Sequence, residues 1–303
     1  MGDQIDLGAV EASVADAIRR KAEVRLLGHG EISIVLGWPT ANPEWALKRV
    51  PPFATAAAAD GYTAAVNRNF ELLAAAGVSV WPTELVRTTR ADGRVVVYHQ
   101  QPIADTTQLG TNLLRVAPDG DPNALAMLDA IVTSAIAVCR PGSVGFDVQA
   151  ANWLWDGATA TQIDFTSPFL LNERGNDLLF DTTSFLREYP GVMRGLLKKE
   201  LIKIVHRFTT PEGAIGDLVA NLQKEYLHRW VDPAIAVAAA RGVVIDRAAT
   251  ETMLAEDAKL MPVLLKMRKA YRWWVQHTGR SYDALLPERT TYELLRQKYG
   301  NAV

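Results

Sequence analysis

Three polar residues near the middle of the chain have the types and spacing that phosphoryl transfer from a nucleotide requires. Asp147 is followed five residues later by Asn152, and Asp164 comes twelve residues after that. In such chemistry one carboxylate receives the proton of an acceptor hydroxyl, while an amide and a second carboxylate hold the magnesium ions on the nucleotide. The triplet therefore predicts a phosphoryl-transfer site.

The sequence around the triplet predicts how its members are held. An apolar helix over 123–139 precedes Asp147. Two short strands within 153–163, joined by an Asp-Gly turn, form a hairpin that brings Asn152 and Asp164 to the same end. Magnesium prefers oxygen ligands and keeps several waters, so one amide and one carboxylate at this end can ligate one ion.

Two earlier elements carry groups that suit the phosphates of a nucleotide. The stretch 24–38 alternates around Gly28 and Gly30, which predicts two strands joined by a tight turn. Glycines there let backbone N–H groups approach phosphates closely. Lys48 lies in a third short strand over 45–50, from which it can reach the α- and β-phosphates.

A helix over 55–76 supplies a candidate partner for this lysine. Glu71 lies in the helix and is the only acidic residue between Asp60 and Glu84. A helix lying against the sheet can hold a glutamate beside Lys48, so we expect an ion pair between the two side chains.

The pattern of elements changes near residue 103 and predicts an α+β fold with two lobes. Residues 1–102 are expected to form a five-stranded antiparallel sheet with one internal helix, which binds the phosphates. Residues 103–303 are mostly helical and are expected to carry the catalytic loop, the metal site and the acceptor pocket. The later helices are expected over 178–188, 191–208, 212–229, 249–276 and 289–299.

Composition and charge exclude several kinds of partner. The 303 residues are 49% hydrophobic with a formal net charge of −2, as in an ordinary soluble globular protein, and nothing indicates binding to nucleic acid. No apolar run reaches membrane-spanning length. The single cysteine, Cys139, excludes an intrachain disulfide framework and favours the cytoplasm. The charge is uneven, because 1–169 carry 12 Lys/Arg against 18 Asp/Glu and 170–303 carry 20 against 16.

Together these motifs resemble the protein-kinase-like superfamily, in particular its branch of aminoglycoside phosphotransferases and choline kinases. The resemblance covers about residues 23–185. It implies that Asp147 is the catalytic base and that Asn152 and Asp164 bind Mg²⁺. It also implies an ATP-binding set, in which Glu71 orients Lys48 and the last three residues lie near the hinge that receives adenine: Gly28, Gly30, Ser33, Lys48, Glu71, Gln100, Gln101 and Ile103.

The chain departs from that family at several positions. Gly145 stands two residues before Asp147, where the family usually has a largely structural histidine. Asp177 resembles the structural acid that steadies the catalytic loop, and Asp181 is its rival for that role. The segment 166–176 is too short for a regulated activation loop, which argues against a eukaryotic-type protein kinase.

Three functions agree with these residues. The first is an ATP- and Mg²⁺-dependent phosphotransferase that acts on a hydroxyl of a small molecule. The second is a Ser/Thr kinase acting on a peptide such as a biosynthetic precursor, and the third is a nucleotide-binding pseudokinase. The net positive charge of residues 170–303 disfavours a polycationic acceptor. The identity of the acceptor, the choice between ATP and GTP and the oligomeric state stay open.

Overall fold

A five-stranded antiparallel sheet forms from the part of the sequence before residue 103. The computed structural model describes residues 5–19, 21, 23–29, 33–278 and 291–299. The strand order is β1-β2-β3-β6-β5, which confirms the expected sheet. The strands are β1 (Leu26–His29), β2 (Ile34–Trp38), β3 (Trp45–Arg49), β5 (Glu84–Thr89) and β6 (Val95–Pro102).

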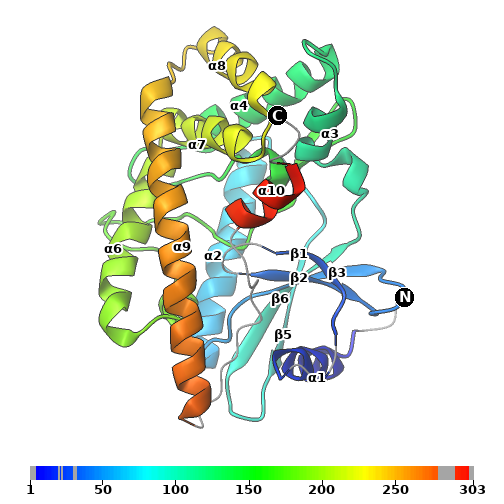
Figure 1. Ribbon diagram of the computed structural model, residues 1–303, viewed down its shortest axis with the longest axis vertical. Coiled ribbons are helices and arrows are strands. Elements are labelled where there is room, and N and C mark those ends of the chain that lie inside the picture. The colour runs from blue at the N-terminus through cyan, green and yellow to red at the C-terminus, as the bar shows by residue number, and fades with distance from the viewer. Residues whose placement is uncertain (1–4, 20, 22, 30–32, 279–290, 300–303) are drawn as a thin grey trace.

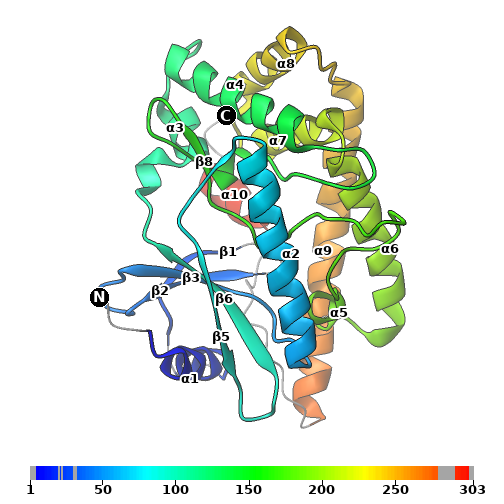
Figure 2. The ribbon, with the colours of Figure 1, turned by 180° about the vertical axis from the view of Figure 1, so that it is seen from behind.

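Two helices cover the two faces of this sheet. Because side chains alternate along a strand, Leu47 and Tyr98 point to one face and pack with α1 (Leu7–Ile18). Val97 points to the other face and packs with α2 (Ala56–Ala75). Figure 1 shows α1 along one side of the sheet, and Figure 2, from behind, shows α2 running alongside β5 and β6. The sheet is thus enclosed between two helices.

A second, smaller sheet links the two parts of the sequence. It has the order β4-β8-β7 and consists of β4 (Ser79–Val80), β7 (Trp153–Trp155) and β8 (Ala160–Gln162). Strands β7 and β8 are antiparallel, whereas β4 pairs with β8 in parallel. The short strand that follows α2 is therefore joined to the hairpin between Asn152 and Asp164.

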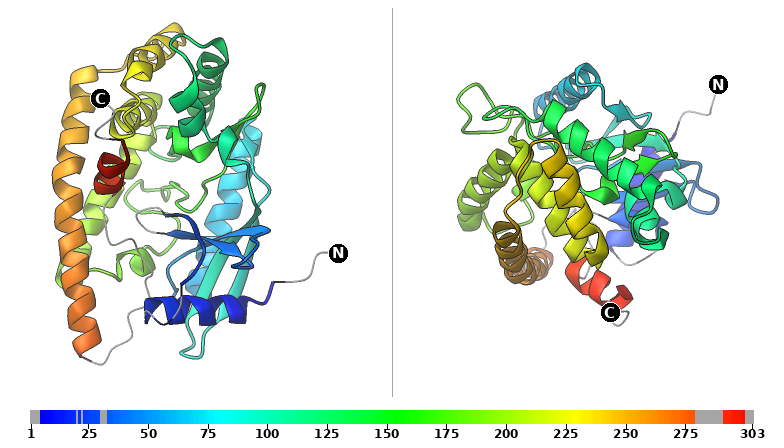
Figure 3. Two further views of the ribbon diagram at one scale, coloured as in Figure 1. Left: turned by 45° about the vertical axis from the view of Figure 1, so that its right-hand side comes forward. Right: turned by 90° about the horizontal axis from the view of Figure 1, so that it is seen from above.

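The remaining chain is mostly helical, and α4 packs against α7 and α8 around a large apolar core. Figure 3 shows this region above the sheet, with α9 along the length of the molecule. The elements are α3 (Gly110–Val116), α4 (Pro122–Val138), α5 (Thr183–Leu186), α6 (Gly191–Phe208), α7 (Pro211–Lys224), α8 (Val231–Ala240), α9 (Arg247–His277), α10 (Thr291–Tyr299) and the 3₁₀ turns η1 (Thr106–Gln108), η2 (Ala150–Asn152) and η3 (His228–Trp230). Among the described helices, none is long and apolar enough to cross a membrane.

The observed fold confirms the α+β class, with an antiparallel sheet followed by a mostly helical region. One expected helix, over 178–188, is largely wrong, because only α5 is helical there. Leu178 and Phe180 are buried while Leu179 is exposed, which is the alternation of extended chain, and Leu178 bridges to Leu171. The division into domains at residues 102 and 103 stays a prediction.

Candidate functional site

Lys48 lies within the sheet, and its buried side chain has an acidic partner. In the antiparallel register it stands between Val35 of β2 and His99 of β6. Only 7% of Lys48 is exposed. Its Nζ forms an ion pair with Oδ2 of Asp164, so the five-stranded sheet and the residue that follows β8 meet at this contact.

Asp164 follows β8, and several groups stabilise its charged form. The backbone N–H and the hydroxyl of Thr166 donate to Oδ1 at 3.0 and 2.8 Å. Burial alone would raise the pKa of this carboxyl, but Lys48 and the two bonds from Thr166 hold the pKa at about 2. Asp164 is therefore ionised at neutral pH.

Asn152 lies at the end of η2, directly before β7. Its carbonyl accepts a hydrogen bond from the N–H of Ile163 at 2.9 Å. Trp153 pairs with Gln162 in the next step of the ladder. These contacts confirm the expected hairpin and place Asn152 beside the residue that precedes Asp164.

Asp147 is half-buried in the loop between α4 and η2. Its Oδ1 accepts the backbone N–H of Gln149 at 3.2 Å, and the side chain of Asn152 also hydrogen-bonds to it. Burial, and then the negative charges of Asp217 and Asp164, raise the pKa of Asp147 to about 7. A carboxyl with this pKa can take up a proton near neutral pH.

Backbone hydrogen bonds and close packing hold the loop that carries Asp147. The N–H of Gly145 donates to the carbonyl of Phe169 at 2.7 Å, and the N–H of Phe146 donates to the carbonyl of Phe208 at 3.0 Å. A Cβ on Gly145 would lie 3.0 Å from Cβ of Phe169 and 3.3 Å from Cβ of Phe208. The space for the expected histidine is filled by these two phenylalanines.

The expectation that Asp177 or Asp181 steadies this loop is wrong, because both carboxylates bond to residues outside the loop. Asp177 forms an ion pair with Lys198 at 2.6 Å and accepts the N–H of Leu178 at 2.9 Å. Asp181 accepts the N–H of Thr183 at 2.9 Å at the start of α5.

The expected pairing of Glu71 with Lys48 is also wrong. Glu71 pairs with Arg68 one helical turn away at 2.7 Å, and 65% of its side chain is exposed. It lies outside the buried face of α2, which consists of Ala59, Tyr62, Ala65, Val66, Asn69 and Leu73. Lys48 pairs with Asp164 instead.

The residues expected near adenine lie at the end of β6 and just beyond it. Gln101 donates from Nε2 to the hydroxyl of Thr83 at 2.9 Å and to the carbonyl of Ile163 at 3.0 Å. Its amide therefore ties the sheet to the residue before Asp164. Gln100 is half-buried and Ile103 is exposed. That this region receives adenine stays a prediction.

The expected phosphate-binding turn is described only in part. Gly28 pairs with Val35 at an irregular step between β1 and β2, and a Cβ on it would meet only Cγ2 of Val35, at 3.9 Å. Ser33 is buried. Gly30 lies outside the described residues. Contact between this turn and a phosphate stays a prediction.

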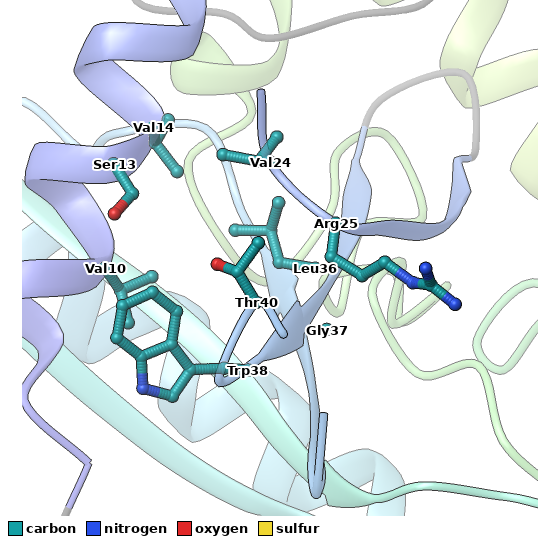
Figure 4. A pocket seen from close by; sticks show the side chains of 9 residues that line it. All are labelled: Val10, Ser13, Val14, Val24, Arg25, Leu36, Gly37, Trp38 and Thr40. Carbon is teal, nitrogen blue, oxygen red and sulfur yellow. The ribbon is translucent and has the colours of Figure 1, made fainter. Parts of the chain in front are cut away.

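That Asn152 and Asp164 bind Mg²⁺ stays a prediction. Among the described residues, no three His, Cys, Asp or Glu side chains form a group that could hold a metal ion. A hollow between α1 and β2, lined by Val10, Leu36, Trp38 and others, lies on the face of the sheet opposite Lys48 (Figure 4). Its walls are mostly apolar, and none of the candidate site residues described above lines it.

Comparison with known proteins gives a family without an assigned activity. A model described as a family of unknown function, DUF6206, matches residues 9–272. The chain belongs to DUF6206. No curated protein matches the sequence. Among solved structures, the kinase domain of Mycobacterium tuberculosis PknI is similar, with 16% sequence identity, coverage of 65% of this chain and 69% of that chain, and a TM-score of 0.31.

In this DUF6206 chain, one acidic residue near the site was missed from the sequence. Asp217 of α7 is only 6% exposed, and its Oδ2 accepts Nε2 of Gln149 at 3.2 Å and Nδ2 of Asn221 at 2.9 Å. Burial raises the pKa of Asp217 to about 6. A single acid inside the apolar stretch of α7 was the available signal, since such an acid is seldom buried without partners.

Proposed function

We propose that this protein is an ATP- and Mg²⁺-dependent phosphotransferase that moves the γ-phosphoryl group to a hydroxyl. The observation that carries the proposal is the meeting of Lys48 with Asp164 beside Asp147 and Asn152. A buried cation, an ionised acid, an amide and an acid with a raised pKa are the groups that phosphoryl transfer needs together.

The donors present fit magnesium. Asp164 is ionised, with a pKa of about 2, and Asn152 lies at the same end of the hairpin, so both offer the hard oxygen ligands that this ion prefers. Bound magnesium would neutralise charge on the phosphates. Thr166 fixes one oxygen of Asp164, and the opposite oxygen faces Lys48. We propose that Lys48, beside this carboxylate, holds phosphate oxygens of the nucleotide.

Asp147 has the properties of the base. Its pKa is raised to about 7 by burial and by neighbouring negative charge, so it can accept the proton of a hydroxyl at neutral pH. The N–H of Gln149 and the side chain of Asn152 fix its orientation. Because in-line transfer depends mainly on positioning and charge neutralisation, this fixed geometry is the chief contribution of the loop.

We propose a small molecule as the acceptor. The chain between Asp164 and α5 folds back on itself within a few residues, because Leu171 bridges to Leu178 and the N–H of Asn172 donates to the carbonyl of Asp177 at 2.8 Å. This compact segment offers no long strand on which a peptide can be laid out, which supports a small alcohol over a peptide.

The first test is binding and transfer by matched variants. Mg-ATP at millimolar concentration is expected to raise the unfolding temperature of the wild type. Asp164→Ala is expected to lose that shift, whereas Asp147→Asn keeps the shift and loses phosphoryl transfer. Asp156→Asn is the control, because Asp156 caps the turn of the same hairpin without reaching the site. Absence of any shift in the wild type, or full turnover by Asp147→Asn, would overturn the proposal.

The second test identifies the acceptor. Wild-type protein is incubated with γ-labelled ATP and either a panel of small alcohols or a panel of Ser- and Thr-containing peptides, with GTP as an alternative donor. Label on an alcohol supports the proposal, label on peptides alone replaces it with a peptide kinase, and binding without transfer in either panel supports a pseudokinase.

A further inference from the structure

A buried hydrogen-bonded chain connects α2, the sheet and the loop that carries Asp164. The hydroxyl of Tyr62 lies 2.7 Å from Nε2 of His99 and donates to the carbonyl of Thr166 at 3.0 Å. Tyr62 is fully buried and His99 is 1% exposed. One tyrosine hydroxyl thus holds both β6 and the residue that fixes the carboxylate of Asp164.

The protons of this chain can be assigned. A carbonyl only accepts, so the single proton of the Tyr62 hydroxyl points to Thr166, and Nε2–H of His99 must be the donor to the Tyr62 oxygen. Nδ1 of His99 then carries no proton and is buried without a hydrogen-bond partner. Burial and the charge of Lys48 lower the pKa of His99 to about 3, so the ring stays neutral.

The same histidine is the direct neighbour of Lys48. The two residues are cross-strand partners of β3 and β6, so their side chains leave the same face of the sheet. A neutral ring leaves the charge of Lys48 free to pair with Asp164, which is where its Nζ lies. The chain from Tyr62 therefore borders both members of the ion pair.

Neither acidic residue of α2 pairs with Lys48. The helix carries two acids, and Asp60 pairs with Arg87 while Glu71 pairs with Arg68 at exposed positions. Tyr62 lies instead on the buried face of α2. Its ring packs on Phe53, Phe180 and Phe185, with centroids 5.2, 5.3 and 5.9 Å away, so the hydroxyl has a fixed position.

We propose that Tyr62 and His99 are positioning residues that set the geometry of Lys48 and Asp164, the task that a helix glutamate would otherwise perform. This proposal rests on the proposed function, because the role given to Tyr62 and His99 is to support the binding of Mg-ATP. Thr166 is the link, since its carbonyl is held by Tyr62 while its N–H and hydroxyl hold Oδ1 of Asp164.

The test compares two buried tyrosines on opposite faces of the same sheet. Tyr62→Phe removes the hydroxyl and keeps the aromatic packing. Tyr98→Phe is the matched control, because the Tyr98 hydroxyl bonds to Glu11 on the α1 side. We expect Tyr62→Phe to bind Mg-ATP about tenfold more weakly, as for the loss of one buried hydrogen bond, with adenosine binding unchanged. We expect Tyr98→Phe to bind both ligands as the wild type does.

Two further measurements separate positioning from folding. Amide hydrogen exchange of the peptide spanning 163–167 is expected to speed up about tenfold in Tyr62→Phe and to stay unchanged in Tyr98→Phe. His99→Gln, whose amide can replace the Nε2–H donor, is expected to restore most of the Mg-ATP affinity that His99→Leu loses.

The outcomes distinguish this inference from the proposed function. A wild type that does not bind Mg-ATP overturns the proposed function and the purpose assigned to the pair. Wild-type binding together with equal affinities and exchange rates in Tyr62→Phe and Tyr98→Phe overturns the positioning role alone. Equal weakening of adenosine and Mg-ATP in Tyr62→Phe also overturns it, because that pattern indicates general loss of structure.

Discussion

Replacing Asp217 by asparagine tests whether the two buried acids beside the loop interact as described. Burial raises the pKa of Asp217 to about 6 and burial with neighbouring charge raises that of Asp147 to about 7. Both values lie above the ordinary value of 3.8, so between about pH 4 and pH 7 the folded protein keeps protons that the unfolded chain has lost. The free energy of unfolding therefore falls as pH rises through this window.

Asp217→Asn replaces one of the two titrating carboxyls by a neutral amide of nearly the same shape. The amide oxygen of the new residue can still accept from Gln149 and Asn221, which bond to Oδ2 of the acid. A shift of about two pKa units corresponds to roughly 3 kcal/mol of unfolding free energy. Because Asp217 and Asp147 titrate as a coupled pair, Asp217 alone contributes only part of that energy. We therefore expect Asp217→Asn to be about 1–3 kcal/mol more stable than the wild type at pH 8. At pH 4 we expect little change, since the acid is then mostly protonated.

The assay is urea unfolding followed by circular dichroism at half-unit steps from pH 4 to pH 8, with the free energy extrapolated to water. Asp60→Asn is the control, because 60% of the Asp60 side chain is exposed and its pair with Arg87 is a surface ion pair, which contributes about 0–1 kcal/mol. If the curves of wild type and Asp217→Asn run parallel across the whole range, Asp217 does not contribute to the pH dependence and the reasoning fails.

Four other variants test the structure in and around the site. Gly110→Ala is expected to lower the unfolding temperature by several degrees, because its Cβ would lie 2.5 Å from a carbonyl oxygen of η2. Gly61→Ala lies within α2, where the new Cβ would meet nothing within 4 Å beyond the helix's own backbone, so it should raise stability by about 0.5–1 kcal/mol. Thermal unfolding of both variants and the wild type measures the two effects. Gly145→His is expected to unfold at lower temperature and lose Mg-ATP binding because two phenylalanines fill its space, and a folded variant that binds as the wild type does would contradict this. Glu71→Gln should leave Mg-ATP affinity within twofold of the wild type, because Glu71 pairs with Arg68. A tenfold loss of affinity in titration calorimetry would instead indicate that Glu71 pairs with Lys48.

Local patterns in the sequence were sufficient for the sheet and the hairpin. Alternation of apolar residues and a turn signal predicted the two strands within 24–38 and the hairpin between Asn152 and Asp164, and the structure confirms both ladders, with Gly28 inside β1. Helix α6 begins and ends at the expected residues, 191 and 208. These features depend on neighbours in sequence, which is why they could be predicted.

Contacts between distant residues could not be predicted in the same way. Glu71 was the only acid in its stretch of α2, but its rotational position around the helix points it to solvent, and small differences in register decide that position. Tyr62 and His99 meet because α2 packs on one face of β6, and no spacing records that packing. Asp217 reaches the loop from a helix about 70 residues later in the chain.

The parallel pairing of β4 with β8 ties the chain after α2 to the strand that leads to Asp164. Val80 is paired with Gln162, and the N–H of Trp81 donates to the carbonyl of Gln162 at 2.8 Å, so the end of α2 is fastened to the strand that leads to Asp164. Tyr62 fastens the same helix near its start. Helix α2 is therefore held to the loop that carries Asp164 near both of its ends. For the proposed function, we expect β1, β2 and β3 to move relative to α2 when a nucleotide enters, while α2 and this loop move together.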